Sequence, residues 1–132
     1  MISRPVVYVV DDDEAAASSL QAVIAANELA VRVFISAEAF LESYTPSFSG
    51  CLLVDVRMTG MNGLELLREL NKRNSPLRTI MISGHADRDL IAAALREGAV
   101  DFFEKPFSCT DMIRKVRQII GDVAAEHEAT GN

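Results

Sequence analysis

Acidic residues crowd the point where the first apolar run of the chain ends. Asp11 and Asp12 directly follow the run "PVVYVV", and Asp55 lies near the end of a second run, "CLLVDV". Two unit charges about 4 Å apart repel by roughly 4 kcal/mol at an effective dielectric of about 20, so one isolated carboxyl group would take up a proton. A divalent cation removes this conflict, and Mg²⁺ suits a site made only of oxygen ligands. The acids therefore predict a magnesium site.

Asp55 is also a candidate for covalent chemistry. A carboxylate beside Mg²⁺ can attack a phosphoryl group and form an aspartyl phosphate. Ser83, after the run "IMI", offers a hydroxyl donor, and Lys105, after "AVDFFE", offers a compact positive charge. Neither needs to act as a strong base, because phosphoryl transfer relies mainly on alignment and charge neutralisation.

The same residues allow plainer interpretations. Acids suit the N-terminus of a helix, which accounts for Asp13 and Glu14 and is open to Asp11 and Asp12 as well. Ser83 taken alone is as consistent with an ordinary buried hydroxyl as with a ligand-binding one. An acid inside "LLVDV", in contrast, is costly to bury without a role, which favours a functional interpretation of Asp55.

A fold is needed that brings these strand ends together. Short apolar runs alternate along the chain with segments of helical period. We expect strands at 5–10, 30–35, 51–56, 77–83 and 99–104, and helices at 14–29, 36–44, 63–74, 87–98 and from about 108 to 123. This alternation predicts an α/β domain with a parallel sheet covered by helices on both faces.

The strand order follows from the apolar patterns. Central strands should be continuous apolar runs, whereas the second strand alternates and Asp101 interrupts the fifth, so these two are the expected edges. With right-handed crossovers this predicts a doubly wound, flavodoxin-like, five-stranded sheet of order 2-1-3-4-5. Ligands of such sheets bind beyond the carboxyl ends of the strands, where the order reverses. Asp11, Asp12 and Asp55 should meet there.

Composition narrows the function further. A net charge of -6 and a pI near 4.8 argue against a basic surface for direct nucleic acid binding by this chain. Its apolar runs are too short to cross a bilayer, and its first residues do not resemble a signal peptide. Cys51 and Cys109 belong to no Cys/His cluster, so we expect buried, reduced thiols in a cytoplasmic protein.

Four motifs together resemble the receiver domain of two-component response regulators. They are, in order, "VVDDDE", "LLVDVRMTGMNGLELL", "IMISGHAD" and "GAVDFFEKPF". Each motif alone is weak evidence, but together their order and spacing match a whole domain. Their residues are most similar to those of the FixJ-type subgroup. The resemblance implies a receiver domain over residues 5–124. Residues 125–132 would be a polar tail, or the start of a linker to an output domain that this chain lacks.

The resemblance assigns roles to the acidic cluster. Asp55 would accept a phosphoryl group from a sensor histidine kinase. Asp12, Asp55 and the backbone carbonyl of Arg57 would bind Mg²⁺ directly, with Asp11 acting mainly through water. The chain would thus be a phosphoacceptor that catalyses its own phosphorylation and dephosphorylation. Transcription would be controlled through the missing output domain.

The resemblance also implies a switch. Lys105 and Ser83 would contact the phosphoryl group, Ser83 would move towards it, and Phe102 would report the change through its rotamer. The Lys105–Pro106 bond would be cis. The surface of the fourth helix, fifth strand and fifth helix would carry the signal, commonly by dimerising.

This chain departs from the family pattern at some positions. Thr59 stands where the family usually has proline, which should loosen that loop by up to about 1 kcal/mol. Phe102 lacks the hydroxyl of a tyrosine found in some relatives, so its switching would rest on packing. Arg57 and His85 would flank the path of water to a phosphorylated Asp55.

Two other function classes stay open at this point. "VYVVDDDEA" loosely fits a haloacid-dehalogenase-type phosphatase with Asp11 as nucleophile and Asp13 as acid and base. Ala15 is atypical there, and such enzymes usually need a longer chain. A degenerate receiver that only binds a partner protein is the other class, and the complete set of acids, serine and lysine argues against it.

Overall fold

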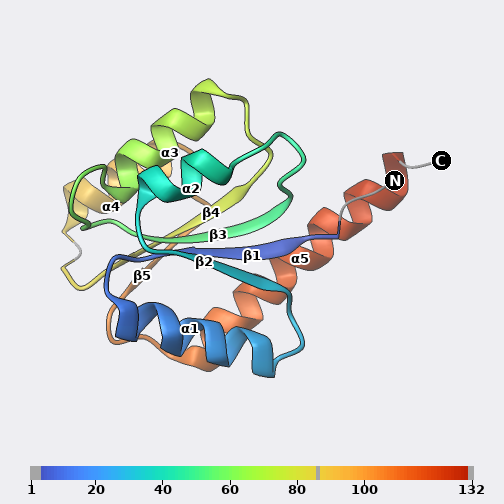
Figure 1. The fold of residues 1–132 in the computed structure, drawn as a ribbon, viewed down its shortest axis with the longest axis horizontal. Helices are drawn as coiled ribbons and strands as arrows, with labels where there is room; N and C mark the ends of the chain where they lie inside the picture. Colours follow the sequence, from blue (N-terminus) through green and yellow to red (C-terminus); the bar gives the residue numbers. More distant parts are fainter. Residues whose placement is uncertain (1–3, 86, 131–132) are drawn as a thin grey trace.

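The computed structural model describes residues 4–85 and 87–130, with side chains described as far as Glu126. Within these ranges strands and helices alternate strictly (Figure 1). The elements are β1 Val6–Val10, α1 Glu14–Ala26, β2 Val31–Phe34, α2 Ala37–Ser43, β3 Gly50–Asp55, α3 Gly63–Lys72, β4 Arg78–Ser83, α4 Arg88–Arg96, β5 Asp101–Glu104 and α5 Cys109–Thr130.

The strands form one parallel sheet of order β2-β1-β3-β4-β5, which confirms the predicted topology. Helices α1 and α5 cover one face, and α2, α3 and α4 cover the other (Figure 1). The strands with continuous apolar runs are the three central ones, and the alternating strand β2 is an edge, as burial on both faces requires.

Alternate residues of each central strand point to opposite faces of the sheet and so contribute side chains to two separate hydrophobic cores. Val7 and Val9 of β1 face α1 and α5, where they join Ile24 and Met112. Tyr8 and Val10 belong to the opposite core, which includes Phe40 of α2 and Leu66 of α3. Burying each such aliphatic side chain contributes roughly 1.5–3 kcal/mol, so both faces hold the sheet between its helices.

Each helix begins behind a side chain that accepts a hydrogen bond from the first turn. These capping residues are Asp13, Ser36, Asn62, Asp87 and Ser108. Asp13 accepts from the amides of Ala15 and Ala16, which confirms its interpretation as part of a helix N-terminus. The caps fix where each helix leaves the carboxyl edge of the sheet.

The cysteine prediction holds for one thiol only, whereas the proposed domain limit stays a prediction. Cys51 is buried as expected, but the prediction that Cys109 is buried was wrong: it is the first residue of α5 and is exposed, and neither thiol forms a disulfide. Helix α5 continues to Thr130, past the proposed domain limit at residue 124, because residues 124–126 favour a helix. Residues 131 and 132 of the proposed tail lie outside the described residues.

Over the part of the chain that the structure describes, no helix combines the length and the apolar content needed to cross a bilayer.

Gly50 gives the first testable prediction. It begins β3 at φ +129°, and a Cβ atom there would lie 2.1 Å from the backbone oxygen of Val6 on β1. We expect Gly50→Ala to lower the free energy of unfolding by about 1–3 kcal/mol, since it combines strain with overpacking against backbone. Urea denaturation measures the change.

Gly121→Ala is the matched control. Gly121 lies in α5 at an ordinary helical φ, and an added Cβ there meets no atom within 4 Å. Alanine should therefore stabilise the helix by up to about 1 kcal/mol. A Gly50→Ala protein as stable as the original would show that the β1–β3 contact is looser than described.

Candidate functional site

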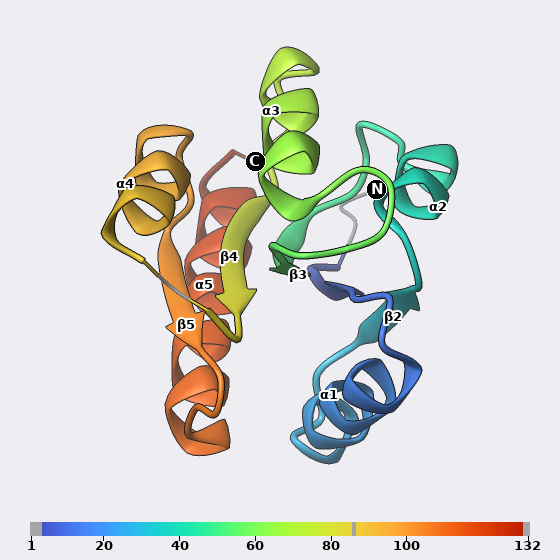
Figure 2. The same cartoon turned by 90° about the vertical axis from the view of Figure 1, so that its left-hand side faces the viewer.

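The predicted site residues meet at the carboxyl edge of the sheet, the edge that faces the viewer in Figure 2. Asp11 follows β1, Asp55 ends β3 and Lys105 follows β5. The Lys105 Nζ atom lies 2.8 Å from Asp55 Oδ2 and 3.6 Å from Asp11 Oδ2. One ammonium group therefore bridges two buried carboxylates that are 44 residues apart in sequence (55 − 11).

Burial has a large effect on the pKa values of Asp11 and Lys105. Asp11 is only 3% exposed, and burial raises its pKa, although the Asp13 amide and the Lys105 charge act in the opposite direction. Burial alone would lower the pKa of Lys105, but the hydrogen bond and charge of Asp55, together with Asp11, raise it overall. Lys105 therefore stays charged and compensates the two acids.

Asp12 occupies a different position. Its side chain is exposed, and its Oδ2 atom accepts a hydrogen bond of 2.9 Å from the backbone amide of Thr59. Neither ion pair of Lys105 involves Asp12. The predicted ligand set is therefore brought to one edge, with Asp12 turned towards the β3–α3 loop.

The loop after β3 is held by further contacts. The Arg57 amide donates to Asp55 Oδ1 at 2.8 Å, and the Met61 amide donates to Glu38 Oε2 at 2.9 Å. A Cβ atom on Gly63 would lie 2.6 Å from the Asp55 carbonyl oxygen, so the start of α3 packs directly on that residue. Sequence reasoning missed Glu38 and Gly63. No spacing links Glu38 to Met61, whereas the glycine in "MNGLELL" was a usable signal.

Ser83 is fully buried at the end of β4. Its Oγ atom accepts from the His85 amide at 3.0 Å and donates to the His85 carbonyl oxygen at 3.2 Å. The hydroxyl thus bonds within the β4–α4 loop, and the structure places it beside the carboxyl edge without a bond to Asp55 among the described residues.

The remaining switch residues lie on and after β5. The Lys105–Pro106 peptide bond is cis, as the resemblance implied. Phe102 is half-buried and packs against the core that contains Met81, its partner in the β4–β5 register. The aromatic ring is thus in contact with the core beside the site rather than with the acids.

The donor set fits a magnesium ion by its chemistry. Among residues 4–85 and 87–130, no three acidic, histidine or cysteine side chains converge as a ready metal cluster. The carboxylates of Asp11 and Asp55 nevertheless both direct an oxygen at one cationic group, and Asp12 lies at the same edge. These are hard oxygen ligands gathered where positive charge is required, which suits Mg²⁺.

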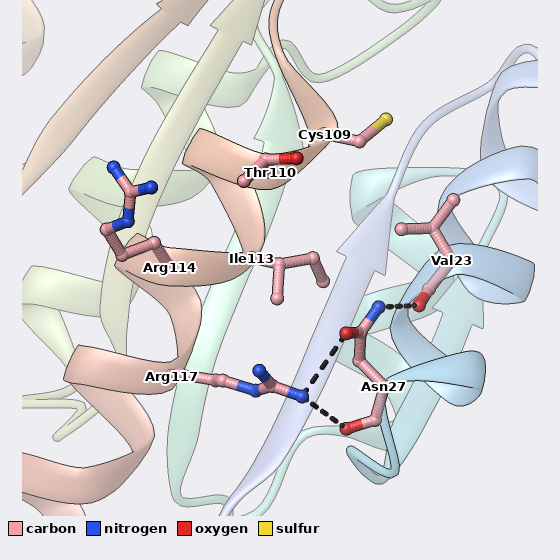
Figure 3. A pocket seen from close by; sticks show the side chains of 7 residues that line it. All are labelled: Val23, Asn27, Cys109, Thr110, Ile113, Arg114 and Arg117. Atoms are coloured by element: carbon pink, nitrogen blue, oxygen red, sulfur yellow. Dashed lines mark hydrogen bonds between the residues drawn. The ribbon is translucent and has the colours of Figure 1, made fainter.

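A cavity of about 380 Å³ lies away from the acids, between α1 and α5 (Figure 3). Arg117 spans it and donates to the carbonyl oxygen and to the Oδ1 atom of Asn27, both at 3.2 Å. An adjoining apolar hollow of about 230 Å³ reaches Lys105 and Pro106. Neither is lined by a carboxylate, so the acidic edge and not these hollows holds the candidate chemistry.

Comparison with known proteins agrees with this geometry. Residues 7–117 match the family described as response regulator receiver domain. The chain is 43% identical over 120 residues to the transcriptional regulatory protein FixJ of Azorhizobium caulinodans, covering 91% of this chain and 57% of that protein. It is 39% identical over 112 residues to the response regulator protein TodT of Pseudomonas putida, covering 85% and 49%. It therefore spans about half the length of these curated relatives.

Solved structures show the same fold. The crystal structure of FixJ-N matches with a TM-score of 0.82 and 38% identity, over 90% of this chain and 95% of that one. A CheY-like response regulator receiver domain protein from Methanospirillum hungatei matches with a TM-score of 0.85 and 25% identity, over 94% and 99%.

Asp11 gives a prediction about stability. Because its pKa is raised above 3.8, the fold holds the charged carboxylate at a cost. That cost is absent well below pH 3.8, grows as the pH rises through this value, and is fully present above the raised pKa. In metal-free buffer at neutral pH, Asp11→Asn should raise the free energy of unfolding by about 0.5–2 kcal/mol.

Urea denaturation with a chelator present measures this effect. Asparagine keeps an acceptor for the Asp13 amide, so the substitution changes mainly the charge. Asp122→Asn, at an exposed position of α5, controls for a change in net charge and should leave stability unchanged. Destabilisation by Asp11→Asn would mean that its ion pair with Lys105 outweighs the cost of burial.

Proposed function

Because this chain belongs to the response regulator receiver family, we propose that Asp55 is its phosphoacceptor and that a histidine kinase is the donor. The observation that carries the proposal is the 2.8 Å contact between Lys105 Nζ and Asp55 Oδ2 at the carboxyl edge. It provides a positive charge beside a buried carboxylate that ends a central strand.

The transfer needs little from the protein beyond alignment and charge. A carboxylate oxygen of Asp55 attacks phosphorus, the bond from phosphorus to the kinase histidine nitrogen breaks, and its electron pair leaves with that nitrogen. Lys105 neutralises phosphoryl oxygens, and the Ser83 hydroxyl becomes a donor to one of them once it leaves His85. Bound Mg²⁺, held by Asp11, Asp12, Asp55 and the Arg57 carbonyl, would supply further charge neutralisation.

We further propose that the site controls the surface of α4, β5 and α5. Ser83 pairs with Glu104 in the β4–β5 register, and Phe102 pairs with Met81, so a shift of the Ser83 loop acts directly on β5. Leu95 on α4 is 50% exposed and Val100, just before β5, is 41% exposed. These apolar side chains suit a homodimer contact that forms on phosphorylation.

The whole protein's role extends this proposal. The matched relatives are about twice the length of the matched region, and the FixJ relative is named a transcriptional regulatory protein. We propose that this receiver controls transcription from the cytoplasm through an output domain outside this chain. Its own acidic charge does not favour direct contact with nucleic acid.

A phosphatase of the haloacid dehalogenase type is less well supported. A phosphatase of this type would use Asp13 as acid and base. The Oδ1 atom of Asp13, however, already accepts hydrogen bonds from two backbone amides at the start of α1. Lys105 is also closer to Asp55 than to Asp11, at 2.8 Å against 3.6 Å. The geometry therefore favours Asp55 as the nucleophile.

Phosphorylation can be measured directly. Incubation with acetyl phosphate and Mg²⁺ should add one phosphoryl group to the intact mass, and a chelator should prevent the addition. Asp55→Asn should abolish the adduct because the acceptor oxygen is lost, whereas Asp13→Asn, which preserves the helix cap, should retain it. An adduct that survives Asp55→Asn but not Asp11→Asn would support the phosphatase. A wild-type chain without any adduct, even with a histidine kinase, would support a degenerate receiver.

Self-association gives a second test. Beryllofluoride, a phosphoryl mimic, should convert the chain from monomer to dimer in sedimentation velocity. Leu95→Asp should prevent the dimer by placing a charge in the proposed contact, while Ala22→Asp on the exposed face of α1 should not. A wild-type chain that stays monomeric with the mimic bound would contradict dimerisation for this chain.

A further inference from the structure

Three alternate amides of segment 57–61 donate to carboxylates from different parts of the fold. The three contacts are Arg57 N to Asp55 Oδ1 at 2.8 Å, Thr59 N to Asp12 Oδ2 at 2.9 Å and Met61 N to Glu38 Oε2 at 2.9 Å. The partners lie on β3, before α1 and on α2. The exposed residues of this segment are thus held by charge-assisted hydrogen bonds, while Met58 and Met61 pack against the core.

The Asp12 contact differs from the other two. Asp55 is a buried strand residue, and Glu38 lies outside the predicted ligand set, but Asp12 is an exposed predicted ligand that joins the loop across 47 residues of sequence. Asp11 and Asp55 both direct an oxygen at Lys105, whereas the loop amide holds an oxygen of Asp12. Among the described residues no three acidic side chains converge while this bond is made, so gathering Asp11, Asp12 and Asp55 around one cation requires the Asp12 carboxylate to turn away from the Thr59 amide.

We propose that the Thr59 amide is a latch on Asp12 that competes with Mg²⁺ and so weakens metal binding by this chain. This inference rests on the proposed function, because it takes Asp12 as a magnesium ligand. It makes Thr59 a positioning residue that acts through its backbone N–H and not through its hydroxyl. Metal binding then releases the middle of the loop, while the Met61–Glu38 contact keeps its far end in place.

The chemistry of position 59 supplies a clean comparison. Proline has no backbone N–H, so Thr59→Pro deletes the latch, whereas Thr59→Ala removes the side chain and keeps the amide. Because Asp12 is exposed, solvent weakens its charge-assisted bond to the range of an ordinary hydrogen bond, which changes an equilibrium by about two- to tenfold. Thr59→Pro should therefore bind Mg²⁺ about two- to tenfold more tightly than Thr59→Ala, which should match the original chain.

Amide NMR on the 132-residue chain measures both affinity and the latch itself. Titration of the metal-free chain and both variants with MgCl₂ gives the dissociation constants. Hydrogen exchange of the Thr59 amide in the original chain should accelerate when Mg²⁺ is added, and exchange of the Met61 amide should not. This second measurement needs no substitution, so it remains decisive if Thr59→Pro folds poorly.

The outcomes separate the two proposals. Equal or weaker Mg²⁺ binding by Thr59→Pro relative to Thr59→Ala overturns the latch and leaves the receiver function standing. Tighter binding without a metal-dependent change in Thr59 exchange also overturns it, because rigidity of the proline then explains the gain. If no form of the chain binds Mg²⁺, both the latch and the proposed metal-dependent function are overturned.

Discussion

The arrangement of the site depends on one ammonium group placed between two buried carboxylates. Lys105 follows β5 at the edge of the sheet, yet it contacts Asp55 on β3, so its side chain must extend past the end of β4. The backbone makes this possible, because the Lys105 amide donates to the Ser83 carbonyl oxygen at 2.8 Å and continues the β4–β5 pairing by one residue. A small side chain at Ser83 leaves that path open. Without the lysine, Asp11 and Asp55 would be two uncompensated charges on neighbouring strands.

The strands, their common carboxyl edge and the starts of the helices could be predicted from the sequence because their signals are local. Burial of a central strand on both faces requires a continuous apolar run, so β1, β3 and β4 could be recognised from composition alone. Once the strands are parallel, every residue that follows a strand lies at the same edge, which is why Asp55 and Lys105 could be placed together. Helix starts were equally visible, since a capping side chain such as Ser36 acts within one turn.

Other features could not be predicted because they depend on how separate loops approach one another. The Thr59–Asp12 and Met61–Glu38 hydrogen bonds span 47 and 23 residues. Their donors are backbone amides, which almost every residue type has, so the sequence does not indicate them. The role of Ser83 towards a phosphoryl group stays a prediction, but the bonds of its hydroxyl to His85 backbone atoms, two residues away, could not be foreseen. The exposure of Cys109 depends on the direction in which α5 leaves its cap, and nothing in the spacing of cysteines specifies it.

These contacts have a common consequence for switching. The site residues already have bonding partners in this structure. Asp11 and Asp55 form ion pairs with Lys105. Asp12 accepts a hydrogen bond from the Thr59 amide, and Ser83 accepts one from the His85 amide. Under the proposed function, a metal or a phosphoryl group would exchange partners with groups already bonded, and exchange at Asp12 or Ser83 would release backbone groups of a neighbouring loop. Since the β3–α3 and β4–α4 loops are anchored by these same bonds, the proposed chemistry at Asp55 would be coupled to their conformation by hydrogen-bond exchange rather than by large movements of the core.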